Sequence, residues 1–224
     1  MAITTRNNQQ KGRLPTGRPL EGKPSLNTES HMKIKLLLFL CFSQTAYSQL
    51  NFSTKLSEAA VELTKQKVVY DPTYFVIKYP NGDVPSDKGV CTDVVVRAYR
   101  KLGIDLQKEV HEDMRANFKK YPQKWRLKQT DKNIDHRRVP NLMTFFSRFG
   151  TVKSISSNPK DYQAGDIICW NLEGNLTHIG IVINKKSVDG QRNLIVHNIG
   201  AGQVIEDCLF NYKIIGHYAY QKQR

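Results

Sequence analysis

One cysteine stands where a loop turns into an apolar segment with helical spacing. Cys91 follows the loop residues DKGV and precedes the run TDVVVRAYRKL. A cysteine in the first turn of a helix lies beside unpaired backbone N–H groups and the positive end of the helix dipole, and both favour the thiolate. Because the thiolate is the nucleophilic form of cysteine, the position of Cys91 predicts attack on an electrophilic carbon.

A catalytic thiol also needs a base within hydrogen-bond reach and a third group that orients the base. His178 begins the apolar segment HIGIVIN, and His197 ends the next such segment, LIVHN. If these segments are strands that pair as a hairpin, the start of one lies opposite the end of the other. We therefore expect Cys91, His178 and His197 to form a catalytic set, provided that the helix N-terminus packs against this edge of the sheet.

Two other roles for the same residues stay open. Zinc accepts thiolate and imidazole ligands, but the chain lacks the CxxC and HxxxH spacings of many zinc sites, so we expect neither a metal nor another cofactor. A single histidine in a strand is also more often a structural core residue. Cys169 lies in the apolar run GDIICW and is expected to pack there, and a disulfide between Cys169 and Cys208 stays open.

The elements that would position the catalytic set fall into two groups along the chain. Helical periodicity predicts helices over 54–66, 91–102, 109–121 and 140–149, and alternation predicts a strand within 73–83. After residue 165 the pattern changes to short strands, at 166–172, 178–184, 193–199, 203–210 and 214–220. Helices followed by an antiparallel sheet of about five strands predict an α+β fold.

The N-terminal residues are expected to lie outside the folded domain. Residues 1–31 are polar and basic, so they are either a disordered leader or an over-called start upstream of the true initiator, Met32. Residues 32–48 have the layout of a secretory signal peptide: two lysines, a short apolar run and a small-x-small cleavage site. The run is too short to span a bilayer. Cys41 follows a bulky leucine and is not a lipid anchor site.

The remaining residues, 49–224, are enough for a single domain with one core. The whole chain has a net charge of +14, and without the 7 basic and 2 acidic residues of 1–48 it keeps +9. A basic exported protein suits a polyanionic partner such as the cell wall. We expect a protein of the periplasm or the extracellular space, monomeric, without a stable membrane anchor, and not a nucleic-acid binder, since no zinc-finger or RNA-binding signature is present.

Six motifs, in order, carry a resemblance to a known family. They are GVCTDVVVRAYRKLGIDL, NIDHRRVPNLMTFF, AGDIICWNL, HIGIVIN, VHNIGAG and IIGHYAY. They resemble a bacterial family of exported proteins catalogued only as a domain of unknown function, which is grouped with the NlpC-like branch of the papain-like cysteine peptidases. The resemblance covers about residues 55–222. Val90 and Thr92 depart from the wider clan, where Asp and Ser are common at these places, and this puts the substrate in doubt more than the fold.

The resemblance implies a papain-like, NlpC-type fold in which Cys91 opens a helix, His178 opens a following strand and His197 lies on the next strand. It implies a cysteine peptidase or amidase that cuts amide bonds in peptidoglycan stem peptides by a Cys-His-His mechanism. Two rival functions remain: a thiol acyltransferase of the same clan, and a non-catalytic wall-binding module in which Cys91 is incidental.

Further residues are expected at the substrate site. The DHRR run before the helix at 140–149 is either a solvated loop, a capping device or a clamp, because arginine pairs bidentately with carboxylates and stem peptides are rich in them. The asparagine after His197 either bonds the turn IGAG or lines the cleft, and the tryptophan of GDIICW belongs to the core or the cleft wall. The predicted substrate-binding residues are Asp135, His136, Arg137, Arg138, Asn198 and Trp170.

Overall fold

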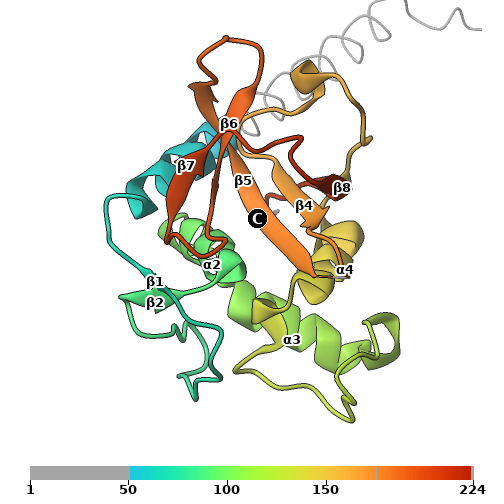
Figure 1. Cartoon of the computed structure of the whole chain (residues 1–224). Coiled ribbons are helices and arrows are strands. Elements are labelled where there is room, and N and C mark those ends of the chain that lie inside the picture. The colour runs from blue at the N-terminus through green and yellow to red at the C-terminus, as the bar shows by residue number, and fades with distance from the viewer. Residues whose placement is uncertain (1–50, 175, 223–224) are drawn as a thin grey trace, which may run out of the picture. The chain divides into compact units, whose positions relative to one another are not determined.

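The computed structural model describes residues 51–174 and 176–222. These residues belong to one compact unit. Helices come first and an antiparallel sheet follows, so the α+β prediction is confirmed (Figure 1). The leader predicted at 1–31 and the signal peptide predicted at 32–48 lie outside the described residues. None of the helices within the described ranges is long and apolar enough to cross a membrane.

Four segments of the described chain are α-helical, close to the four predicted. They are residues 51–63, α2 (Cys91–Lys101), α3 (Leu106–Ala116) and α4 (Val139–Phe149). The helix α3 begins earlier than predicted because the Asp105 side chain caps it, accepting a hydrogen bond from the Lys108 backbone N–H at 3.2 Å. Short 3₁₀ turns, η1 (Phe118–Lys120), η2 (Asp135–Arg137) and η3 (Pro159–Asp161), lie in the connections.

The C-terminal half forms one six-stranded antiparallel sheet with the strand order β3-β8-β4-β5-β6-β7, drawn in orange to red in Figure 1 apart from β3. Its strands are β3 (Thr151–Val152), β4 (Ile167–Asn171), β5 (Thr177–Lys186), β6 (Asn193–His197), β7 (Val204–Glu206) and β8 (Lys213–Ala219). The five predicted strands are all present. The sixth, β3, has only two residues, too short for alternation to reveal.

The strand predicted within 73–83 is wrong. This segment has no strand partner, and the backbone N–H of Ile77 is instead held by the side chain of Asn133 at 3.1 Å. A two-residue strand just before it, β1 (Val69–Tyr70), pairs in parallel with β2 (Lys88–Gly89). Alternating apolar residues therefore indicate an extended segment, but a strand also requires a neighbour that the local sequence does not specify.

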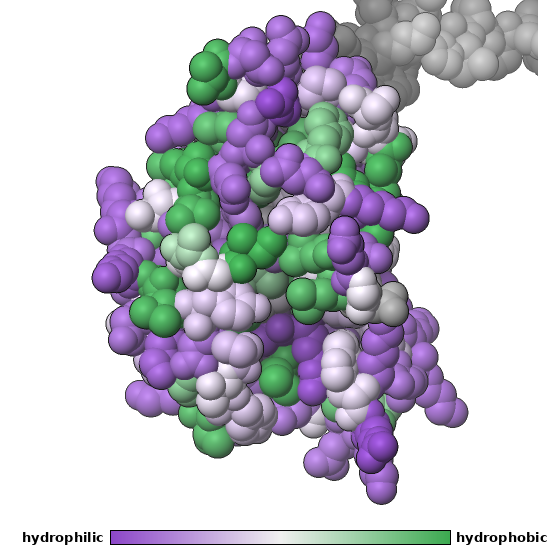
Figure 2. Space-filling view, viewed as in Figure 1, coloured by the Kyte–Doolittle hydropathy of each residue, from purple (hydrophilic) through white to green (hydrophobic). Residues whose placement is uncertain are grey.

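Both faces of the sheet are buried, and residues alternate between them. On β4, Ile167 and Cys169 join a large cluster with the helices, whereas Ile168 and Trp170 join a smaller cluster on the other face. The smaller cluster also contains Tyr162, Val182, Ile195, Cys208 and Leu209. Outside, the surface of the face shown in Figure 1 is mixed, with apolar residues set among polar ones (Figure 2).

Candidate active site

The helix α2 begins at Cys91, as predicted. In its first turn, the Asp93 carboxylate accepts a hydrogen bond from the backbone of the residue before the helix. The preceding residue, Val90, has no side-chain acceptor, but its backbone N–H donates to Asp93 Oδ2 at 2.7 Å. Arg97, one turn further along, donates to the carbonyl oxygens of Pro85 and Lys88. Hydrogen bonds therefore join the loop before Cys91 to α2. They hold the backbone at Cys91 in place and so orient its side chain.

The Cys91 side chain is buried, with an exposed fraction of 7%. Burial raises the pKa of its thiol to about 12, although hydrogen bonds from the backbone N–H groups of Ile179, Thr92 and Cys91 itself work in the opposite direction. The donors expected at a helix N-terminus are thus present, but desolvation outweighs them. At neutral pH the thiol is protonated in this structure, so the helix N-terminus alone does not produce a thiolate.

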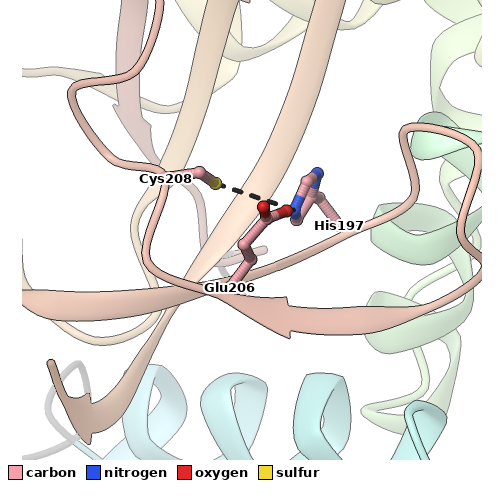
Figure 3. Close-up of side chains that lie close together, drawn as sticks. All are labelled: His197, Glu206 and Cys208. Atoms are coloured by element: carbon pink, nitrogen blue, oxygen red, sulfur yellow. Dashed lines mark hydrogen bonds and ion pairs between the residues drawn. The ribbon is translucent and has the colours of Figure 1, made fainter. Parts of the chain in front are cut away.

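The two histidines lie together as predicted. The strands β5 and β6 pair antiparallel with Ile181 opposite Val196, which brings the start of β5 beside the end of β6. His178 Nε2 lies 2.9 Å from His197 Nδ1, and His197 Nε2 lies 2.8 Å from a carboxylate oxygen of Glu206 on β7 (Figure 3). The three side chains form a hydrogen-bonded relay, His178–His197–Glu206.

The carboxylate at the end of the relay sets the direction of its hydrogen bonds. An ionised Glu206 only accepts, so Nε2 of His197 carries a proton and Nδ1 of that ring accepts one from His178 Nε2. Nδ1 of His178 then keeps its lone pair, as a general base must. Burial lowers the pKa of His178 to about 3 and also lowers the pKa of His197, so both rings are neutral at pH 7.

The thiol is connected to the relay through the backbone of one residue. Among the described residues, no hydrogen bond joins Cys91 Sγ to either histidine; the thiol is instead held by the backbone N–H of Ile179, the residue after His178. Cys91 belongs to the helix-side cluster, whereas His178 packs on Trp170 of the opposite cluster. The thiol and the His178 ring are therefore linked only through the backbone of Ile179 in this structure, and catalytic hydrogen bonds in ligand-free enzymes are often not yet closed.

The DHRR run is mostly buried and braces the helix that carries the thiol. Arg137 donates from Nε to Asp93 Oδ1 and from Nη2 to Asp93 Oδ2, each at 3.0 Å. Its carbonyl oxygen accepts from the hydroxyl of Thr92 at 3.2 Å. Because its guanidinium is already paired with a carboxylate of the protein, Arg137 positions the first turn of α2.

The other three members of this run differ in exposure. Asp135 is buried 3.0 Å from His111 Nδ1, and burial raises the pKa of its carboxyl. His136 is also buried, which lowers its pKa to about 3. Arg138 is half-buried, and its guanidinium carbon lies 4.5 Å from the centroid of the exposed Trp125 ring. Arg138 is thus the member of the run best placed to meet a ligand from solvent.

The last two predicted site residues hold the surroundings of the histidines in place. Asn198 is buried and donates from Nδ2 to the carbonyl oxygen of Gly89 at 3.1 Å, while its Oδ1 accepts from the N–H of Gly200 at the same distance. It thus bonds the IGAG turn and joins the end of β6 to the loop before the thiol. Trp170 is 1% exposed, donates from Nε1 to the Leu209 carbonyl oxygen and lies against the His178 ring.

Two residues near the site were missed by the sequence reasoning. Glu206 had no signal in the sequence, because its place depends on the register of β7 on β6, in which Val204 is opposite His197 and Glu206 follows two residues later on the same face. Tyr70 had none either. Partial burial raises the pKa of its phenol, and the phenol also interacts electrostatically with Cys91 and Asp93 in the first turn of α2.

The cysteines of the described chain, Cys91, Cys169 and Cys208, are all free. Cys169 packs in the helix-side cluster and Cys208 in the cluster on the opposite face, so the sheet separates the pair that was considered for a disulfide. Cys208 Sγ instead lies 3.6 Å from His197 Nε2.

Two comparisons with known proteins cover this site. The family described as "Domain of unknown function (DUF1287)" matches residues 57–220. The chain is similar to "Uncharacterized protein YijF" of Escherichia coli (strain K12), with 52% identity over 172 residues that make up 77% of this chain and 83% of that protein. The expected resemblance to a domain of unknown function is confirmed, and neither description names an activity.

Proposed function

Because this chain belongs to the DUF1287 family, whose description names no activity, we propose its function from its own site: an exported thiol hydrolase that cuts amide bonds. The observation that carries the proposal is the relay His178–His197–Glu206, in which both histidines are buried. It leaves Nδ1 of His178 unprotonated, and the next residue, Ile179, holds the Cys91 thiol through its backbone N–H. A relay of this kind supplies a base and its orienting groups, as nucleophilic catalysis by a thiol requires.

In the proposed mechanism, Nδ1 of His178 takes the proton of the Cys91 thiol while Sγ attacks the carbonyl carbon. The backbone N–H of Cys91, at the start of α2, donates to the oxyanion that forms. His178 then gives its proton to the leaving amine, and water releases the acyl group from the sulfur. His197 keeps the His178 ring in the required tautomer throughout, and Glu206 does the same for His197.

The burial of both partners determines when the proton moves. A thiol with a pKa of about 12 and an imidazole with a pKa of about 3 do not form an ion pair at rest. Proton transfer must therefore accompany the attack on the substrate. In this proposal, binding of the substrate also brings the thiol and His178 Nδ1 into contact. The backbone donors around Sγ are already in place to stabilise negative charge on the sulfur as it develops.

For the substrate, we propose an amide bond of peptidoglycan stem peptides and an NlpC-type fold. The resemblance of the ordered motifs to the NlpC-like peptidases supports this, as do the basic charge and the predicted export signal. A thiol acyltransferase would use the same residues. A wall-binding module is less well supported, because binding requires no relay of this kind.

The test compares the wild-type protein with Cys91→Ala and with Cys208→Ser, the matched control for a second buried thiol. Each is incubated with purified peptidoglycan and with defined stem-peptide fragments, and products are read by mass spectrometry. We expect new fragments from the wild type and Cys208→Ser alone. Cleavage by Cys91→Ala would rule out the mechanism. A thioester on Cys91 formed only from acyl-donor lipids would favour the acyltransferase.

A further inference from the structure

The outer end of the relay gathers a second set of reactive groups. His197 Nε2, a carboxylate oxygen of Glu206 and Cys208 Sγ all lie within 4.8 Å of one another. Figure 3 shows the three side chains converging from β6, β7 and the turn that follows β7. Hydrolysis as proposed above uses the first two of these residues, and it leaves the thiol of Cys208 without a role.

The distances suit a tetrahedral zinc ion. Ligands about 2.0 Å (nitrogen, oxygen) and about 2.3 Å (sulfur) from zinc stand about 3.5 Å apart for a nitrogen–sulfur pair and about 3.3 Å apart for a nitrogen–oxygen pair. Here His197 Nε2 lies 3.6 Å from Cys208 Sγ and 2.8 Å from the Glu206 oxygen. The carboxylate oxygen would have to move away from the His197 ring by about half an ångström to admit the ion.

The surroundings also favour a cation. The Glu206 carboxylate supplies negative charge at the site, whereas the neighbouring Asp207 is already paired with Arg192 at 2.6 Å. His197 and Cys208 are buried, whereas the Glu206 side chain is 50% exposed. An ion could therefore enter from solvent past Glu206, with a water molecule as fourth ligand, as in zinc sites with three protein ligands.

We propose that His197, Glu206 and Cys208 bind a zinc ion, and that zinc bound there switches off the Cys91–His178 pair. The first part stands on the geometry alone. The second part rests on the proposed function, because it concerns the base that the hydrolase would use.

Inhibition follows from the direction of the relay. Zinc takes the Nε2 lone pair of His197, so that ring must carry its proton on Nδ1 and donate to His178 Nε2. His178 is then protonated on Nδ1 and has no lone pair for the Cys91 thiol. The protons balance: Cys208 and His197 Nε2 each release one to solvent, His178 Nε2 passes its proton to His197 Nδ1, and His178 Nδ1 takes one from solvent.

The binding test is equilibrium dialysis of the purified protein against zinc chloride at neutral pH. We expect one zinc per chain in the wild type, and an affinity weaker by more than about tenfold in Cys208→Ser and Glu206→Gln. Asp207→Asn is the matched control, since it removes the neighbouring charge and no ligand, and Cys91→Ala excludes binding at the other thiol. Zinc binding that survives Cys208→Ser would overturn the site.

The switch is tested by the rate at which iodoacetamide labels Cys91, followed by mass spectrometry of the peptide that contains it. Zinc should slow this labelling by at least about tenfold in the wild type and in Asp207→Asn, and leave it unchanged in Cys208→Ser. Bound zinc without an effect on Cys91 labelling would overturn the switch. Failure of the hydrolase proposal would show separately, as an absence of cleavage in zinc-free protein.

Discussion

At the scale of the residue, Glu206 is the group that gives the relay a direction. In Glu206→Gln the amide can donate as well as accept, so the tautomer of His197 is no longer fixed. We expect kcat on stem-peptide fragments to fall by about 10- to 100-fold, as when a group that orients a functional histidine is removed, with KM little changed. Steady-state kinetics check this, with Glu58→Gln, an exposed glutamate of the helix 51–63, as the control. Equal kcat values in the two variants would contradict it.

Single residues also show what the sequence could and could not predict. The meeting of His178 and His197 was predictable, because a hairpin brings the start of one strand to the end of the next. The protonation state of Cys91 was not, since burial decides it and burial is a property of the packed molecule. Glu206 required the register of β7 on β6, which a short edge strand does not reveal.

At the scale of the element, the first turn of α2 depends on its link to η2. Replacing Arg137 with methionine leaves the buried Asp93 carboxylate without its partner, which should cost about 3–5 kcal/mol of unfolding free energy. Lys65→Met is the control, because its side chain is 71% exposed in the pair with Glu62, and such exposed pairs contribute little to stability.

Urea denaturation of both variants measures the difference. If Arg137→Met loses no more stability than Lys65→Met, the brace has no energetic role. Adding Asp93→Asn to Arg137→Met should recover part of the loss, because the uncompensated charge is then gone.

The burial of the DHRR run could not be foreseen from its composition. Aspartate, histidine and arginine are mostly exposed, and are buried chiefly when paired. The partner of Arg137 lies on another element, 44 positions away at Asp93, so local sequence favours a solvated loop where the structure has a buried connection.

At the scale of the whole molecule, buried neutral histidines link stability to pH. The pKa values of His136 and His178 are lowered to about 3, whereas an unfolded histidine titrates near 6.5. The unfolded chain therefore binds more protons than the folded chain below pH 6.5. Above that pH, the contribution of these histidines to the unfolding free energy is fully present. It falls as the pH drops towards 3, by up to about 1.4 kcal/mol per pH unit for each histidine.

Urea denaturation between pH 7.5 and pH 4.5 measures how the unfolding free energy changes with pH. In His136→Gln this change should be smaller by the contribution of one histidine. Asp135, whose carboxyl pKa is raised by burial, acts in the opposite direction and makes the observed slope smaller. Stability that does not change over this range in the wild type would contradict the prediction.

The hydrogen bond between Asn198 and Gly89 joins positions 109 residues apart in the chain. The thiol is therefore made long before the strands that carry its base, and any chain that ends before β5 holds a nucleophile without the His178 base. During synthesis Cys91 should therefore lack its general base, and the proposed activity should begin only when the last three or four strands have paired. The order of the elements along the chain thus delays the proposed activity until synthesis is nearly finished. With this order, the proposed hydrolase would need no separate segment to keep the unfinished chain inactive.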